Sequence, residues 1–145
     1  MGEDRLQQFS KIKASEIMVK NPLFVTPDKK ISATELLMLR KKIGGLPVVI
    51  DQKNQHLIGI ITQRDIRLAR LAMSLESPNT TVKDLMTSEP YVVKGDEVVR
   101  NILKIMFEKT IQRLPVINDN GQLIGLIIQS QILKKLFEFM KTAFA

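Results

Sequence analysis

The chain has 145 residues, a net charge of +7, 44% hydrophobic residues and only 5% aromatic residues. This length and composition fit one compact domain, or two small halves that share a core of aliphatic side chains. The sequence has no cysteine, which excludes disulfides, thiolate metal sites and cysteine nucleophiles and fits a reducing cytoplasm. No apolar run approaches the ~18 residues of a membrane span, and the first residues do not resemble a signal peptide. We therefore expect a cytoplasmic protein with no membrane partner.

The apolar pattern of the first half predicts short strands that alternate with helices. Residues 1–13 are polar and mixed, which indicates a short helix or a frayed arm. After it we expect a helical turn at 15–18, a strand at 23–25, a helix at 31–42, strands at 46–50 and 57–61, and a helix at 63–75. Ser15 is expected to cap the first turn, and the pair Gly44 and Gly45 to end the helix at 31–42.

The second half repeats this order. We expect a helical turn at 82–86, a strand at 91–93, a helix at 98–108, strands at 114–117 and 123–128, and a final helix from 129 to about residue 141. Residues 118–121 read Asn-Asp-Asn-Gly, a composition suited to a hairpin turn with positive φ.

The two halves match residue by residue. Met18 and Met38 correspond to Met86 and Met106 at an offset of 68, which shrinks to 66 after the longer first loop at 52–56. We therefore expect an α/β fold of two β-α-β-β-α units, packed through their sheets with pseudo-two-fold symmetry, because each copy alone would be a marginal domain. The expected organisation is an N-terminal arm at 1–13, a first domain at 14–76, a linker at 77–80, and a second domain at 81–145 that includes the C-terminal helix.

Several short strings carry a resemblance to a known family. They are Val25-Thr26-Pro27-Asp28, Gly44-Gly45-Leu46-Pro47-Val48, Leu57-Ile58-Gly59-Ile60-Ile61-Thr62-Gln63-Arg64-Asp65, and in the second copy Arg113-Leu114-Pro115-Val116 and Leu123-Ile124-Gly125-Leu126-Ile127. In this order and given twice, they resemble a tandem pair of CBS domains, the module named after cystathionine β-synthase, over nearly all of residues 14–138. The resemblance implies a stand-alone regulatory module that binds an adenosine-containing ligand, such as AMP, ADP, ATP or S-adenosylmethionine, in a cleft between the copies.

The segment that ends at Asp65 carries the sharpest chemical signal. A strand runs directly into a helix, whose amino end presents free backbone N–H groups suited to phosphate. Thr62 offers a hydroxyl, and the Asp65 carboxylate can accept hydrogen bonds from both hydroxyls of a ribose. The resemblance implies that Thr62 holds the phosphate and Asp65 the ribose. The alternative is a capping box with a purely structural role.

The resemblance also implies the rest of the cleft wall. Its residues are Ile60, Arg64, Gly44, Gly45, Gln112, Arg113, Thr87, Pro90 and Tyr91. Arg113 would contact a phosphate and Tyr91 would stack on the adenine; the alternatives are a solvated arginine, a core or rim tyrosine, and an ordinary helix end at the glycine pair. In the second copy, Ile128 and Gln131 replace Thr62 and Asp65. We therefore expect one competent site per chain.

Three functions stay open at this point. The first is an adenine-nucleotide sensor that forms a homodimer through its final helix and signals to an unknown protein partner. The second is a nucleic-acid-binding protein attracted through the charge of +7, although the basic residues are dispersed. The third is a structural dimerisation module with a vestigial cleft. We do not expect an enzyme, a metal site or a cofactor beyond the regulatory nucleotide, because His56 is the only histidine and no nucleophile or acid–base pair stands out.

Overall fold

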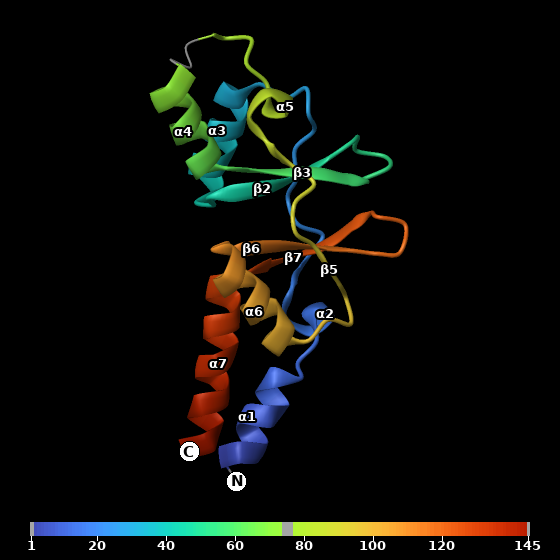
Figure 1. Ribbon diagram of the computed structural model, residues 1–145, viewed down its shortest axis with the longest axis vertical. Coiled ribbons are helices and arrows are strands. Elements are labelled where there is room, and N and C mark those ends of the chain that lie inside the picture. The colour runs from blue at the N-terminus through green and yellow to red at the C-terminus, as the bar shows by residue number, and fades with distance from the viewer. Residues whose placement is uncertain (1, 74–76, 145) are drawn as a thin grey trace. The chain divides into compact units, whose positions relative to one another are not determined.

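The computed structural model describes residues 2–73 and 77–144 and divides the chain into two compact units. Unit 1 comprises Met1–Pro22, Tyr91–Asp119 and Ile124–Ala145, whereas unit 2 comprises Leu23–Pro90 and Asn120–Leu123. Each unit contains helices and one β-sheet (Figure 1). This mixed α/β architecture confirms the expected fold class.

Unit 2 is built around a three-stranded sheet of order β2-β3-β4. Its elements are α3 (Ile31–Lys41), β2 (Gly45–Val49), β3 (Leu57–Thr62), α4 (Gln63–Met73), α5 (Val82–Leu85) and β4 (Thr87–Ser88). Both strand pairs are antiparallel. The helices α3 and α4 lie together beside the β2–β3 pair (Figure 1), and they bury the aliphatic core of this unit, which includes Ile31, Met38, Leu46, Val48, Ile61, Ile66 and Val82.

Unit 1 is built around a four-stranded sheet of order β1-β7-β6-β5. Its elements are α1 (Gly2–Ser10), α2 (Ala14–Ile17), β1 (Val19–Lys20), β5 (Val93–Lys94), α6 (Val99–Lys109), β6 (Arg113–Ile117), β7 (Leu123–Ile128) and α7 (Gln129–Phe144). The core includes Val99, Ile102, Met106, Leu114, Val116, Ile127 and Ile132. Helix α1 adds Phe9 to this core, where its ring packs edge-on against Phe139 of α7 at 5.6 Å.

The units exchange one segment between the two sequence repeats. The short helix and strand that open each repeat, α2–β1 and α5–β4, lie in the unit that holds the helices and main strands of the other repeat. Equivalent hydrogen bonds fix both segments: Ala14 N–H donates to the Glu97 carbonyl at 2.7 Å, and Val82 N–H donates to the Lys29 carbonyl at 2.8 Å. Each compact unit is therefore assembled from both repeats.

Two predicted caps were wrong. Helix α3 ends at Lys41, and Lys42 rather than the glycine pair takes the left-handed conformation, with φ 55°. A hydrogen bond from Ile43 N–H to the Met38 carbonyl at 3.0 Å closes that end, which is the satisfaction of terminal carbonyls that a helix end needs. Helix α2 is capped by Lys13 rather than Ser15, since Lys13 N–H donates to Glu16 Oε2 at 2.7 Å.

The shortest strands also differ from expectation. In the predicted strand at 23–25, only Val25 forms a bridge, parallel to Val48, and the strand expected at 91–93 is reduced to Val93–Lys94. The predicted end of the helix at 63–75 falls on residues 74 and 75, outside the described residues. Gly121 has φ +79° in the predicted hairpin turn. Across residues 2–73 and 77–144, the helices are too short or too polar for any of them to cross a membrane.

Candidate functional site

Thr62 and Asp65 lie together where β3 runs into α4. The backbone N–H and the hydroxyl of Thr62 both donate to Asp65 Oδ2 at 2.9 Å. In return, the Asp65 N–H donates to Thr62 Oγ1 at 3.2 Å. This reciprocal set is a capping box, so the structural role considered from the sequence is present.

A third residue joins this pair from another strand. The Thr87 hydroxyl on β4 donates to the second carboxylate oxygen of Asp65, Oδ1, at 3.4 Å. Thr87 is held there because it pairs with Ile60 in the β3–β4 ladder. The sequence placed Thr87 among the site residues but did not predict this contact. Both oxygens of a half-buried carboxylate are therefore aimed at hydroxyl donors, the kind of partner that a ribose also provides.

The chain contains an internal comparison for this geometry. Thr81 and Asp84, at the start of α5, form the same reciprocal pair, with distances of 2.9 Å from the Thr81 N–H and 3.1 Å from its hydroxyl to Asp84 Oδ2. Asp84 is exposed and is the third residue of a helix of only four residues. A capping box alone therefore does not mark a binding site here. The pair at 62 and 65 differs because its carboxylate also receives the Thr87 hydroxyl and lies at the amino end of an 11-residue helix.

The loop from α3 to β2 borders the same helix start. Gln63 N–H donates to the Gly44 carbonyl at 2.9 Å, and Gly45 pairs with Thr62 across β2 and β3. Arg64 follows directly and is exposed. Unit 2 thus gathers most of the predicted site around the start of α4, namely Gly44, Gly45, Ile60, Thr62, Arg64, Asp65 and Thr87. Pro90 is the part-buried residue at the end of this unit's long segment.

The three other predicted residues belong to unit 1. The Gln112 carbonyl accepts from Gln129 N–H at 2.9 Å, as the Gly44 carbonyl does in unit 2. Arg113 opens β6, and partial burial lowers the pKa of its guanidinium. Tyr91 is exposed, and the Lys109 ammonium lies 5.3 Å from the centre of its ring.

The equivalent position in unit 1 lacks the carboxylate and both threonine hydroxyls. There, Ile128 and Gln131 replace Thr62 and Asp65, and Val19 on β1 replaces Thr87. Val19 pairs with Leu126, in the same register as Thr87 with Ile60. The substitution at Val19 was missed in the sequence, although the offset of 68 residues points to it. All three hydrogen-bonding positions thus differ between the units.

Two open hollows lie elsewhere on the described surface. One, of about 200 Å³, is lined by Glu16, Ile17, Gln131, Lys134, Lys135 and Glu138 in unit 1. The other, of about 730 Å³, is lined by Asp51, Gln52, Lys53, Asn54 and Gln122 in unit 2. The exposed ring of His56 packs near Gly121. Across residues 2–73 and 77–144, no three histidine, aspartate or glutamate side chains cluster as a metal site.

Known proteins resemble this chain in both sequence and fold. Inosine-5'-monophosphate dehydrogenase of Methanocaldococcus jannaschii is 33% identical over 134 residues, which cover 92% of this chain but 25% of that enzyme. The chain thus spans about a quarter of the curated relatives it matches. The crystal structure of CBSX2 in complex with AMP is similar with a TM-score of 0.76 and 25% identity, covering 88% of this chain and 98% of that one.

A second solved structure adds a different ligand. The CBS domain pair of protein MJ0100, in complex with 5'-methylthioadenosine and S-adenosyl-L-methionine, is similar with a TM-score of 0.74 and 26% identity, covering 88% of this chain and 96% of that one. The CBS domain family matches this chain twice, at residues 14–72 and 82–138. The chain belongs to the CBS domain family, as a tandem pair.

Proposed function

We propose that this chain is a regulatory module that binds an adenosine-containing ligand at the start of α4 in unit 2. The observation that carries the proposal is the Asp65 carboxylate, which already accepts hydrogen bonds from Thr62 and Thr87. The cis-diol of a ribose would take over those acceptor positions. The Thr62 hydroxyl and the positive amino end of α4 would then interact with a phosphate. The AMP complex of CBSX2 and the S-adenosylmethionine complex of MJ0100 support this ligand class.

One site per chain follows from the same chemistry. In unit 1 the side chains of Val19 and Ile128 cannot donate or accept hydrogen bonds, and Gln131 lacks a negative charge. A ribose placed there would lose the charged carboxylate that can accept from both of its hydroxyls. The dehydrogenase activity of the relatives is not carried over to this chain, because the match covers only about a quarter of those enzymes.

Regulation also requires a partner that senses the bound ligand. We infer a second copy of this chain as one such partner, because α7 presents two apolar faces. Ile132, Leu136 and Phe139 pack into the core of unit 1, whereas Leu133, Phe137 and Met140 are at least half exposed. A ligand can shift such an assembly only if it binds the two states with different affinity.

The test uses the two capping boxes as a matched pair. Asp65→Ala and Asp84→Ala each remove one capping carboxylate and should each cost about 1 kcal/mol of stability. Calorimetric titration with AMP, ATP and S-adenosylmethionine should show saturable binding near one ligand per chain for the wild type and Asp84→Ala. Asp65→Ala should weaken binding at least about tenfold, which is the cost of about 1.4 kcal/mol. Equal affinity in Asp65→Ala and the wild type would refute the site.

A further inference from the structure

The two repeats differ sharply in charge at one place. Six basic residues occupy the end of α3 and the outer side of α4, namely Arg40, Lys41, Lys42, Arg64, Arg67 and Arg70. The equivalent residues of the second repeat are Glu108, Lys109, Thr110, Ser130, Leu133 and Leu136. The net charge over these six positions is therefore +6 in the first repeat and zero in the second.

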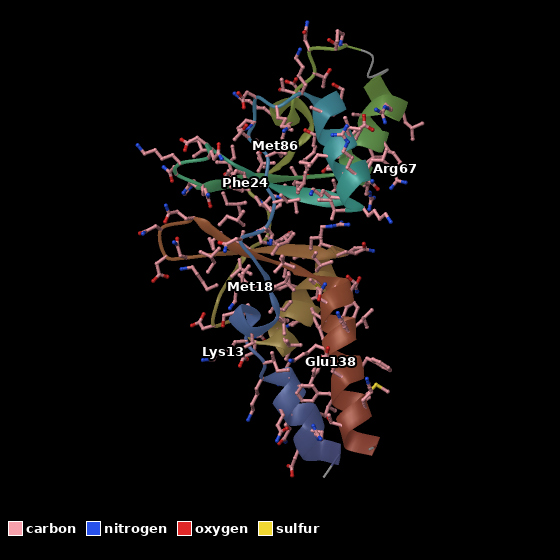
Figure 2. All side chains as sticks on the ribbon, turned by 180° about the vertical axis from the view of Figure 1, so that it is seen from behind. Lys13, Met18, Phe24, Arg67, Met86 and Glu138 are labelled. Atoms are coloured by element: carbon pink, nitrogen blue, oxygen red, sulfur yellow. The ribbon has the colours of Figure 1, made fainter. Side chains whose placement is uncertain are left out.

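Most of this charge has no acidic partner. Arg70 pairs with Glu35 on α3, but no ion pair in the described part of the chain involves the other five. All five are exposed, and Figure 2 labels one of them, Arg67. Unpaired like charges on neighbouring helix ends repel one another, so this cluster is unfavourable to the isolated protein.

The fold does not need these charges. Thr110 takes the same left-handed conformation as Lys42, with φ 54° against 55°, and Ser130 occupies the same second position of its helix as Arg64. The same backbone is thus built in unit 1 with neutral residues. The basic residues of unit 2 therefore point to something that this unit binds.

Lys42 and Arg64 lie beside the proposed nucleotide site. The hydrogen bond from Gln63 N–H to the Gly44 carbonyl, 2.9 Å long, holds the end of α3 against the start of α4. Lys42 is two residues before Gly44, and Arg64 lies between Thr62 and Asp65. Lys42 and Arg64 therefore add positive charge next to the amino end of α4.

We propose that the ligand of unit 2 is a nucleoside polyphosphate, with Lys42 and Arg64 contacting the phosphates beyond the first. The proposal rests on the proposed function and goes further, because it selects among adenosine ligands. A single phosphate is satisfied by the Thr62 hydroxyl and the positive amino end of α4, which leaves the added cations without a role. Each further phosphate adds negative charge that these cations can neutralise. S-adenosylmethionine has no phosphate, and its sulfonium is repelled by the cluster.

The experiment exchanges the cations for the residues that the second repeat carries. Lys42→Thr and Arg64→Ser are titrated calorimetrically with AMP, ADP, ATP and S-adenosylmethionine at fixed ionic strength without divalent cations. Arg100→Ser is the control, because Arg100 is exposed and is also the second residue of its helix, α6. The wild type should bind ATP and ADP more tightly than AMP. Each test variant should weaken the affinity for ATP about tenfold and the affinity for AMP less than about threefold. Arg100→Ser should bind all four ligands as the wild type does.

The outcomes separate this proposal from the proposed function. The polyphosphate proposal is refuted if AMP binds at least as tightly as ATP, or if both variants weaken the affinities for AMP and ATP equally. The proposed nucleotide site stands in either case. If none of the adenosine ligands binds, both fail. A third outcome is that ATP does not bind and that Lys42→Thr and Arg64→Ser weaken the binding of a fluorescent single-stranded oligonucleotide. The cluster is then a nucleic-acid surface, and the proposal is overturned.

Discussion

Arg113 illustrates how the burial of one charged residue can cost stability. Its guanidinium is part-buried, its pKa is lowered by that burial, and no ion pair in the described residues involves it. Arginine is charged at neutral pH in both the folded and the unfolded chain, so folding transfers a cation from water into a poorer solvent. Natural sequences keep such residues where a binding partner supplies the missing negative charge.

We predict that Arg113→Met leaves the free energy of unfolding unchanged or raises it by up to about 1 kcal/mol, because a buried charge is exchanged for a side chain of similar length. Urea denaturation measures this change. Arg100→Met, on an exposed position, is the control and should leave the free energy of unfolding unchanged. A loss of more than about 1 kcal/mol in Arg113→Met would mean that its guanidinium supports the fold.

At the residue scale, the sequence predicted the chemistry better than the contacts. Thr62 and Asp65 are three residues apart at a strand–helix junction, so local spacing was enough to bring them together. Thr87 reaches Asp65 from 22 residues away, and no local pattern encodes that approach. Lys42 was overlooked for another reason: its left-handed conformation is the one usually assigned to glycine, and two glycines follow it closely.

At the scale of elements, a glycine and a methionine fix each short outer strand. A Cβ added to Gly59 of β3 would lie 2.8 Å from Met86 Sδ and 2.9 Å from the Thr87 carbonyl oxygen. A Cβ added to Gly125 of β7 would lie 2.2 Å from Met18 Sδ, and its three nearest atoms all belong to the Met18 side chain. Figure 2 labels both methionines. Neither glycine has a positive φ, so each is needed for close approach rather than for backbone conformation.

We predict that Gly59→Ala and Gly125→Ala both destabilise the protein, each by about 1–3 kcal/mol in urea denaturation. The double variant Gly125→Ala with Met18→Ala should recover part of the loss, because the nearest atoms there belong to a flexible side chain. Adding Met86→Ala to Gly59→Ala should recover less, because the Thr87 backbone oxygen stays in place. Gly59→Ala should also weaken nucleotide binding by displacing Thr87 from Asp65. Equal recovery in the two double variants would contradict the role assigned to that oxygen.

The long elements were predictable and the short ones were not. The helices at 31–41 and 99–109 show the apolar periodicity of amphipathic helices. The strands β1 and β4 have two residues each, too few for an alternating pattern. Their positions depend on pairing with β7 and β3, which lie far along the chain. Hydrogen bonds of this kind follow from the topology rather than from local sequence.

At the scale of the whole chain, the exchange of opening segments determines which residues make up each folded unit. Residues 82–88, which complete the sheet of unit 2, open the second repeat, and residues 14–20, which complete the sheet of unit 1, open the first repeat. The repeats at 14–72 and 82–138 are therefore units of sequence, whereas each folded unit draws on both. The repeat itself was visible in the sequence, but the exchange was not, because both arrangements have the same order of elements.

Assembly into a homodimer gives the last prediction. Phe107 of α6 and Phe137 of α7 are 69% and 59% exposed, and their equivalents in unit 2, Leu39 and Leu71, are 72% and 86% exposed. Apolar groups at matching positions of both repeats indicate a recurring contact surface rather than scattered exposure. We propose that a second copy of the chain covers it.

Sedimentation velocity should show a dimer for the wild type and for Lys134→Glu, an exposed control on α7. The double variant Phe107→Glu and Phe137→Glu should sediment as a folded monomer, because two charges would be buried at each contact. A monomeric wild type at tens of micromolar would exclude the dimer, and a double variant that remains dimeric would place the contact on another surface.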